Sequence, residues 1–363
     1  MNGKSIRQYY IDNLRWLCIL FLVPFHALMA WNCWLEGTCI YFYPNKWYSS
    51  VITLVSPWYM PLLFVLAGIT ARYSLKKRTI KEYIRERFCK LFIPLVVGIV
   101  TIVPVMTYYA DIYHNNYSGN FFSHYTIFFS RFTDLTGADG GWTPAHLWFL
   151  LYLFVISLFS VVVIYIQKRL SPKFNMENMN LFILWSFVII IAVGSLILNI
   201  GGKSVGMYAI LFMSGYYIFY EKTMIEKLKK YRWLHMLIFC IANVIDVYLF
   251  IWCDKTYKIQ TTIAMYFTLW FGILAILGFA SKNFNISNRL TRFLSTRSFD
   301  FYIVHYVWLV ILQFYFRTWT DNDLLLFIGP VLLTYVLSFI TAEVIYIVKK
   351  HILKNDFDGL ESK

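Results

Sequence analysis

The sequence predicts an all-α protein, a bundle of about ten transmembrane helices with both chain termini in the cytoplasm. Apolar residues make up 59% of the 363 residues and charged residues only 14%, whereas a soluble chain would be roughly a quarter charged. Apolar runs long enough to cross the hydrocarbon, about 17 to 25 residues, recur along the chain, and Lys and Arg concentrate in alternate connections. We therefore expect a single membrane domain over residues 1–363.

The predicted spans follow one another from about residue 12 to about residue 348. Their approximate ranges are 12–32, 48–72, 88–109, 145–166, 181–199, 204–221, 233–252, 261–280, 298–317 and 324–348. Two connections are longer than simple turns, a basic loop at 72–90 and an aromatic, polar loop at 110–144. Loops of the second kind are typical either of a lid or sugar-binding surface, or of a packed cap.

The distribution of basic residues predicts the orientation of the bundle. The N-terminus, the connections at 72–90, 167–180, 221–232 and 281–297, and the tail 349–363 hold 26 Lys and Arg residues, and the opposite set holds six. Loops rich in Lys and Arg stay in the cytoplasm, so the loop at 110–144 is expected outside. The net charge of +14 then reflects topology and attraction to the lipid bilayer, and implies no nucleic-acid partner. We expect a multi-pass protein of the plasma or inner membrane.

Cysteine spacing predicts no metal centre. The six cysteines contain no C-x-x-C pair and no zinc-type spacing, although Cys33 and Cys39 could close a small disulfide. The sequence "GKSVG" at 202–206 spells G-x-S-x-G, but an apolar span precedes it instead of the strand that a hydrolase nucleophile requires.

The first span carries two ionisable residues on one face. Arg15 and His26 are eleven residues apart, which on a helix returns to within roughly 20° of the same face, about 16 Å along the axis. Arg15 can pair with Asp12 three residues earlier, or bind an anionic group. His26 is expected deep in the membrane, where such residues are rare and face a cavity or a partner. A hydrogen-bonded structural His26 and an anchoring Arg15 are the alternative.

This Arg-x10-His pattern, preceded by Asp12, resembles the signature of the acyltransferase type 3 family, integral-membrane enzymes that acylate hydroxyl groups of glycans, lipids and antibiotics. Residues 56–104 resemble the family's second and third spans with their basic connection, "HLWFLLYLF" (146–154) its Leu-Trp-Phe-Leu element, and "STRSFDFYIVH" (295–305) its late Tyr-x-x-His element. The resemblance covers about residues 8 to 350. It looks closest to the glucan biosynthesis protein C group.

The resemblance implies transfer of an acetyl or succinyl group from cytosolic acyl-CoA to a hydroxyl of a cell-surface or exported glycan. Acyl-CoA would be a co-substrate, with no tightly bound cofactor. His26 would be the general base, with a transient acyl-histidine as a variant, and Arg15 would act in catalysis at the donor entrance.

The family's basic element for binding the donor corresponds to Arg85, Arg87 and Lys90, although topology and lipid anchoring explain these charges equally well. Two departures stand out. Ala67-Gly68 replaces the usual Ser-Gly, and Lys90 replaces a second arginine, which keeps the charge but loses bidentate geometry.

Further polar and aromatic residues are expected to support the cavity. They are Asp12, Trp148, Ser298, Tyr302 and His305. Trp148 also suits an interfacial aromatic belt, and His305 could simply bind a backbone carbonyl.

A secondary transporter is the alternative function, with Arg15 and His26 on an ion or anion path. That alternative predicts internal pseudo-symmetry, and no internal repeat is visible in the sequence. The sequence leaves open which acyl group and acceptor are used, how the acyl group crosses the membrane, and the oligomeric state.

Overall fold

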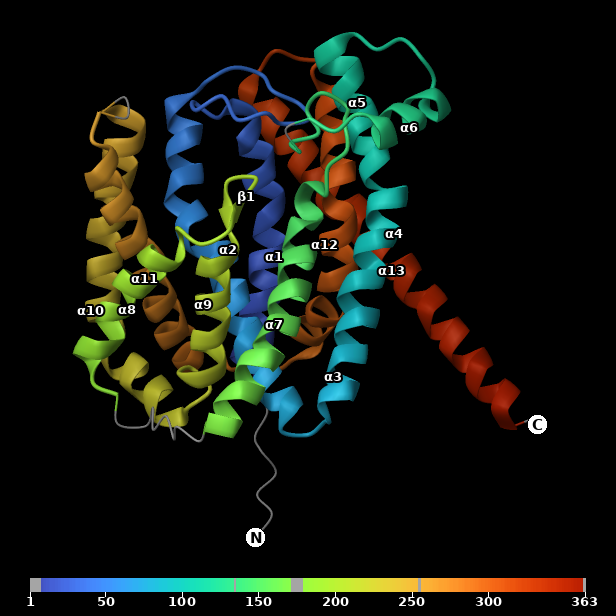
Figure 1. Cartoon of the computed structure of the whole chain (residues 1–363). Helices are drawn as coiled ribbons and strands as arrows, with labels where there is room; N and C mark the ends of the chain where they lie inside the picture. The colour runs from blue at the N-terminus through green and yellow to red at the C-terminus, as the bar shows by residue number, and fades with distance from the viewer. Residues whose placement is uncertain (1–7, 134, 171–178, 254–255, 362–363) are drawn as a thin grey trace. The chain divides into compact units, whose positions relative to one another are not determined.

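The computed structural model describes residues 8–133, 135–170, 179–253 and 256–361, with side chains to residue 351 (Figure 1). Helices dominate these residues and confirm the all-α prediction. The strands among them are the two-residue β1 (Asn199–Ile200) and β2 (Lys203–Ser204), which pair antiparallel with Asn199 opposite Ser204.

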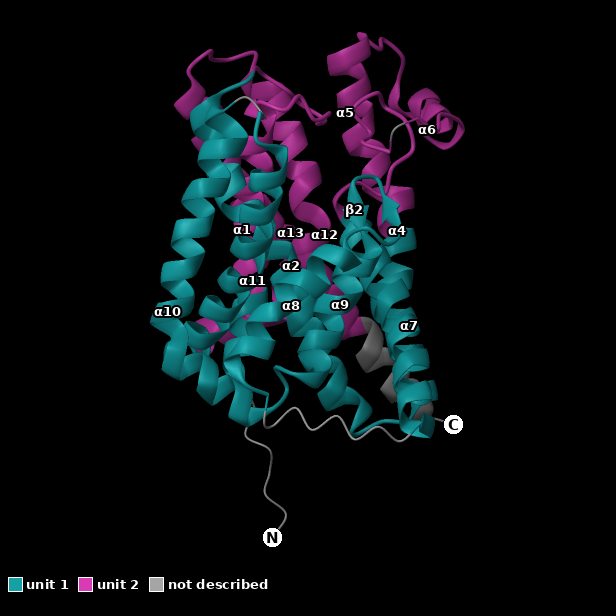
Figure 2. Cartoon of the chain, turned by 60° about the vertical axis from the view of Figure 1, so that its left-hand side comes forward, with its two compact units in different colours: residues 1–15, 44–97, 147–286 teal, residues 16–43, 98–146, 287–363 magenta. Residues whose placement is uncertain are grey.

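The helices group into two compact units that alternate along the sequence (Figure 2). Unit 1 contains residues 1–15, 44–97 and 147–286, and unit 2 contains residues 16–43, 98–146 and 287–363. The first helix, α1 (Tyr9–Leu28), begins in unit 1 and ends in unit 2.

Unit 1 contains most of the middle of the chain. Its elements are α2 (Lys46–Leu75), α3 (Ile80–Arg87), the π-helix η2 (Phe88–Phe92), the first half of α4 (Ile93–Thr101), α7 (Trp148–Leu170), α8 (Leu181–Gly194), α9 (Val205–Tyr217), α10 (Lys222–Val247), the π-helix η5 (Tyr248–Trp252) and α11 (Lys258–Asn283).

A reciprocal glycine contact joins α2 to α9 in unit 1. A Cβ atom on Gly68 would lie 1.9 Å from the carbonyl oxygen of Phe212, and one on Gly215 would lie 2.0 Å from that of Val65. Glycine at both positions therefore allows the two backbones to touch. This contact gives Gly68 of the Ala67-Gly68 pair a packing role.

Unit 2 contains the remaining helices. They are the later parts of α1 and α4, η1 (Met29–Trp31), α5 (Val103–Asn115), α6 (Phe121–Ser130), the start of η3 (Ala145–Leu147), α12 (Arg289–Phe316) and α13 (Asp323–Glu361). We use "Cys39 core group" for a set of buried residues at its centre, Cys39, Ile40, Met106, Ala110 and Val310.

Hydrogen bonds fix α1 against α12 and α13 in unit 2. Gln313 Nε2 donates to the carbonyl oxygen of Ala27 over 3.2 Å, and the Tyr335 hydroxyl donates to that of Leu20 over 2.7 Å. Arg297 binds both carboxylate oxygens of Glu343, Nε at 2.9 Å and Nη2 at 3.0 Å. Bidentate pairs of this kind fix geometry as well as charge.

Eight helices in the described residues are long and apolar enough to cross a membrane. The predicted spans 181–199 and 204–221 instead correspond to α8 and α9, of 14 and 13 residues. The reason is the β1–β2 hairpin between them, in which Gly201 and Gly202 have positive φ angles. Ser204 of the G-x-S-x-G sequence is buried and caps α9 by accepting from the Met207 amide.

Several predicted boundaries and one predicted bond differ from the structure. The basic connection 72–90 is mostly helical, because α2 continues to Leu75 and α3 begins at Ile80. The loop predicted at 110–144 begins only after α5 ends at Asn115, and the tail 349–363 continues α13. Cys33 and Cys39 form no disulfide in the described residues, so the suggested bond is not observed.

Candidate active site

The two ends of the predicted Arg15–His26 stripe lie on one continuous helix. α1 runs through Pro24 without ending. Arg15 Nη1 lies 3.3 Å from Asp12 Oδ1, which confirms the predicted i, i+3 ion pair. The Arg15 side chain is 36% exposed, so it keeps a charged group at the surface of the helix.

His26 belongs to a group of rings in unit 2, which we call the imidazole cluster: His26, His146, His305, Tyr302 and Tyr306. The centroid of the His26 ring lies 5.6 Å from that of His305 and 4.5 Å from that of Tyr306. The His146 ring lies 5.2 Å from that of His305 and 5.5 Å from that of Tyr306. Three imidazoles from α1, η3 and α12 therefore meet at one place in the fold.

The helical repeat of α12 explains part of this arrangement. Tyr302, His305 and Tyr306 are three and four residues apart, so they share one face of the helix. The buried Tyr302 hydroxyl donates to the carbonyl oxygen of His146 over 2.6 Å, which attaches η3 to this face.

Backbone carbonyls determine which nitrogen of each supporting imidazole carries hydrogen. His305 Nδ1 lies 2.7 Å from the carbonyl oxygen of Tyr302, and His146 Nε2 lies 3.0 Å from that of Ile303. A carbonyl oxygen only accepts, so both nitrogens must be donors. His305 Nε2 and His146 Nδ1 are buried and have no hydrogen-bond partner among the described residues. Two proton-accepting nitrogens are thus buried in the cluster.

His146 is a member that sequence reasoning missed. It is the first residue of the "HLWFLLYLF" segment, so the sequence carries a signal for it, whereas the Leu-Trp-Phe-Leu resemblance points to Trp148. The preceding residue, Ala145, has a positive φ angle of 45°. Such strained backbone positions are costly and cluster at functional sites. The strained turn directs the chain from the preceding loop into η3 and α7.

Trp148 and Ser298, two other predicted support residues, have contacts of their own. Trp148 belongs to an aromatic group of unit 1, with its ring centroid 5.3 Å from Tyr152 and 5.5 Å from Tyr208, and the Lys203 ammonium lies 5.1 Å from the Trp148 ring. Ser298 donates to the carbonyl oxygen of Ser295 over 3.2 Å, two helical turns before His305. Of the predicted support residues, Tyr302 and His305 are members of the imidazole cluster.

The predicted donor-binding residues lie on one helical segment of unit 1. Lys90 Nζ lies 2.7 Å from Glu86 Oε1, and Arg87 Nη2 lies 3.6 Å from Glu86 Oε2. Arg85 is exposed, and the guanidinium of Arg87 lies over the Tyr83 ring at 4.8 Å. Two of the three cations therefore share one carboxylate, which the sequence prediction did not take into account.

The described residues contain no group of three His, Cys, Asp or Glu side chains that could hold a metal ion. The imidazole cluster has three imidazoles, but its members are held by carbonyl oxygens and ring contacts.

The long apolar helices and the buried imidazole cluster define a multi-pass membrane protein with a site suited to proton transfer. A family model described as "Acyltransferase domain" matches residues 8–345, and the chain belongs to this family, the acyltransferase type 3 family. It is therefore an acyltransferase, which favours the enzyme over the secondary transporter. No curated protein and no solved structure matches the sequence significantly.

Proposed function

We propose that the protein transfers an acetyl or succinyl group from cytosolic acyl-CoA to a hydroxyl group of a cell-surface or exported glycan, at the plasma or inner membrane. The observation that carries this proposal is the imidazole cluster, because the His26 ring lies beside that of His305, which lies beside that of His146, and both of these rings have a defined tautomer. The likeness to the glucan biosynthesis protein C group, which rests on the sequence, is the reason to include succinyl-CoA.

Proton transfer is the task that the acyl acceptor requires. A thioester is already activated, so the enzyme must remove the hydroxyl proton as the C–O bond forms and the C–S bond breaks. His26 accepts that proton, since imidazole has an unperturbed pKa close to neutrality. The same proton then passes to the leaving thiolate of CoA, and His26 returns to its starting state.

The neighbouring imidazoles, His305 and His146, assist His26 as fixed hydrogen-bond acceptors. Their buried lone pairs, His305 Nε2 and His146 Nδ1, can accept hydrogen bonds from His26 or from the acceptor hydroxyl. Because backbone carbonyls fix both rings, they need no rearrangement when the proton moves. His305 and His146 are thus positioning residues around the base.

Donor binding is assigned to the cationic residues. Coenzyme A carries phosphates, which Arg and Lys bind through charge-assisted hydrogen bonds. Arg15, Arg85, Arg87 and Lys90 supply such charges, and Glu86 competes for two of them. Donor phosphates would displace Glu86 from Arg87 and Lys90.

The test is acyl transfer by the purified full-length protein in nanodiscs. Labelled acetyl-CoA and succinyl-CoA are offered with a panel of glycans to the wild type, His26→Ala and Arg15→Ala. Loss of a general base lowers the rate by about 10²- to 10⁴-fold, so His26→Ala should lose transfer while its thermal unfolding stays like that of the wild type. Undiminished transfer by a folded His26→Ala protein would exclude His26 as the base. Arg15→Ala should mainly raise the KM for acyl-CoA.

A further inference from the structure

A second site lies in unit 2, outside the imidazole cluster. A pocket of about 380 Å³ opens between the segment at residues 42–43, α5 and the turn from α12 to α13. We call it the Arg317 pocket. Aromatic rings line one part of it, Phe42, Tyr43 and Tyr113, and polar groups line the rest, including Arg317, Asp321 and Asp323.

The cation of this pocket is held in place before any ligand binds. The guanidinium carbon of Arg317 lies 4.4 Å from the ring centroid of Tyr113 and 4.6 Å from that of Phe314. Its Nε donates to the carbonyl oxygen of Phe314 over 3.2 Å. Stacking on aromatic faces is a property of guanidinium groups, and a fixed side chain loses little entropy on binding.

The aromatic walls are fixed in the same way. The Tyr43 hydroxyl donates to the carboxylate of Asp323, and the Tyr113 hydroxyl donates to the carbonyl oxygen of Tyr41. Tyr43 is nevertheless 43% exposed, so its hydroxyl is anchored while the side chain stays partly open to solvent. The pocket is thus built from side chains that are already oriented by partners.

The mixture of groups selects the chemistry of the ligand. A phosphate would meet two carboxylates and one guanidinium, so an anionic ligand is disfavoured. An ammonium group would be attracted by the net charge of the lining, but it would also meet Arg317, and Asp323 already accepts from the Tyr43 hydroxyl. A ring bearing several hydroxyls satisfies both kinds of group. Its hydroxyls donate to Asp321 and accept from Arg317, and its C–H face packs on Tyr43.

The position of the pocket relates it to the imidazole cluster. Arg317, at the C-terminal cap of α12, follows Tyr306 by eleven residues, which places it within roughly 20° of the same face and about 16 Å further along the axis. Phe42 and Tyr113 of the pocket and Tyr306 of the cluster all pack against the Cys39 core group. Pocket and cluster therefore lie at two points along one face of α12.

We propose that the Arg317 pocket is a saccharide subsite that binds a remote sugar ring of the acceptor while another ring presents its hydroxyl to the imidazole cluster. This proposal rests on the proposed glycan acceptor and adds to it that the acceptor is an oligosaccharide. Binding energy from a remote part of a substrate can be used at the reacting centre. A monosaccharide acceptor would lose that contribution.

Saccharide binding is measured first, on the full-length protein in nanodiscs without acyl-CoA. Calorimetry and saturation-transfer NMR are run with gluco-, manno- and N-acetylglucosamine oligosaccharides and with their monosaccharides. Tyr43→Ala should weaken oligosaccharide binding about tenfold, a loss of about 1.4 kcal/mol. Tyr43→Phe, which keeps the ring, should bind more tightly than Tyr43→Ala, and Asp321→Asn should weaken binding severalfold.

Trp319→Ala is the matched control, because Trp319 is an exposed aromatic residue of the same turn, 73% exposed, and lies outside the pocket lining. It should bind like the wild type. The proposal is overturned if every oligosaccharide fails to bind at millimolar concentration, or if Trp319→Ala weakens binding as much as Tyr43→Ala.

Acyl transfer then separates this proposal from the proposed function. The expected result is a higher kcat/KM for oligosaccharides than for monosaccharides, a difference that Tyr43→Ala abolishes. Equal transfer to both acceptors, unchanged in Tyr43→Ala, overturns the subsite and leaves the proposed function standing. Binding that depends on Tyr43 without transfer to any acceptor supports a saccharide site and contradicts the proposed function.

Discussion

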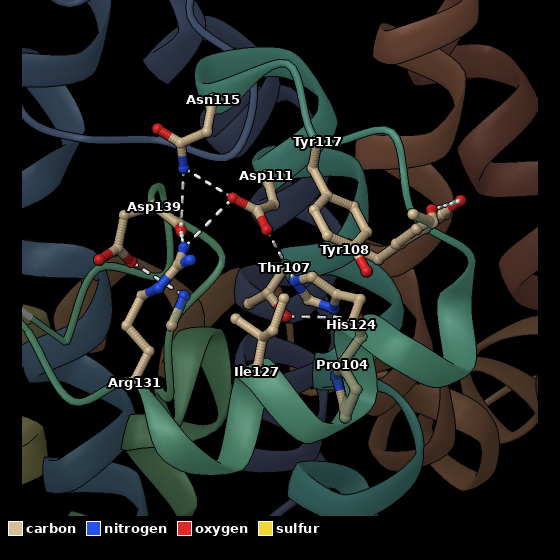
Figure 3. Close-up of polar contacts among 12 residues, drawn as sticks. Pro104, Thr107, Tyr108, Asp111, Asn115, Tyr117, His124, Ile127, Arg131 and Asp139 are labelled. Atoms are coloured by element: carbon tan, nitrogen blue, oxygen red, sulfur yellow. Dashed lines mark hydrogen bonds and ion pairs between the residues drawn. The ribbon is translucent and has the colours of Figure 1, made fainter.

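Unit 2 buries histidines in two regions with opposite surroundings. In the α6 segment (residues 116–144), His124 lies opposite a carboxylate, with its Nε2 3.6 Å from Asp111 Oδ2 (Figure 3). In the imidazole cluster, His146 and His305 are held by backbone carbonyl oxygens and contact other imidazoles. Carbonyl hydrogen bonds orient the His146 and His305 rings, whereas His124 faces the Asp111 carboxylate and neither of its ring nitrogens has a hydrogen-bond partner among the described residues.

The α6 segment is a paired electrostatic network. Asp111 is buried, and its Oδ1 accepts from Asn115 Nδ2 at 2.6 Å and from Arg131 Nη1 at 3.2 Å. Arg131 also donates to the carbonyl oxygen of Asp139 (Figure 3). Of the two interpretations of the loop at 110–144, the contacts of these described residues fit a packed cap. The comparison teaches that burial alone does not mark a catalytic histidine.

The largest expected effect is on catalysis in the imidazole cluster. His305→Asn keeps a donor to the carbonyl oxygen of Tyr302 and removes the Nε2 lone pair, and His146→Gln keeps a donor to that of Ile303 and removes the Nδ1 lone pair. Each should lower kcat by about 10²-fold if the lone pairs assist His26. Steady-state kinetics measures the loss, and unchanged thermal unfolding serves as the control. Wild-type kcat in both variants would reduce the two histidines to packing residues.

A substitution of Asp111, the α5 residue that binds the α6 segment, should affect stability instead of catalysis. Asp111→Ala removes the carboxylate that binds Arg131 and Asn115, and because the Arg131 side chain is 36% exposed and water can replace its partner, the cost is about 1–3 kcal/mol. Amide hydrogen exchange over residues 121–133 should accelerate accordingly, while kcat at low temperature stays within about twofold of the wild type, since the loosening is local. A large fall in kcat with unchanged hydrogen exchange would mean that Asp111 serves catalysis and not stability.

Acidification should loosen the α6 segment. Burial lowers the pKa of His124 below its usual 6.5, against the opposing effect of the Asp111 carboxylate, and Arg131 lowers it further. The unfolded segment then binds a proton that the folded one resists, so stability is fully present above pH 6.5 and is lost as the pH falls toward the folded pKa.

Asp139 extends the same trend to lower pH. Burial alone would raise the pKa of Asp139. Hydrogen bonds from Thr133 and the Gly141 amide, together with the charge of Arg131, outweigh burial and lower this pKa below 3.8. The stability that ionised Asp139 contributes is fully present above pH 3.8 and is lost as the pH falls through the pKa of Asp139 in the folded state. Hydrogen exchange of residues 121–133 measured against pH tests both effects. His124→Gln should remove the pH dependence of exchange just below pH 6.5 and leave the dependence at lower pH that Asp139 causes.

The smallest expected effect is in unit 1, at the proposed donor-binding residues. Glu86→Gln removes the carboxylate that Arg87 and Lys90 share, and should lower the KM for acyl-CoA about two- to fivefold, since the Lys90 side chain is 68% exposed and ion pairs of exposed side chains contribute little. Titration of acyl-CoA at saturating acceptor measures it. Arg85→Gln is the matched comparison and should raise the KM. A KM that is unchanged in both variants would remove this segment from the donor site.

Some features of the site could be read from local sequence. The Arg15–His26 spacing and the Asp12 ion pair depend only on helical geometry and on residues in one helix. The grouping of Tyr302 and His305 follows the same rule on α12. The contacts of Trp148 and Ser298 could not be predicted in this way, because a motif indicates neighbours in sequence, whereas Trp148 packs on Tyr208 of another helix and Ser298 donates to the carbonyl oxygen of Ser295 one turn earlier.

Hydropathy, composition and helical periodicity are local properties, so the class of the protein, its helical fold and the stripe on the first helix could be predicted from the sequence. The contact of His146 with His305, and the ring nitrogens that keep a lone pair, depend on how distant segments fold together. The tautomer of His146 depends on a carbonyl of Ile303, 157 residues from His146. Contacts between distant segments arise from packing of the whole chain, and no local pattern specifies them.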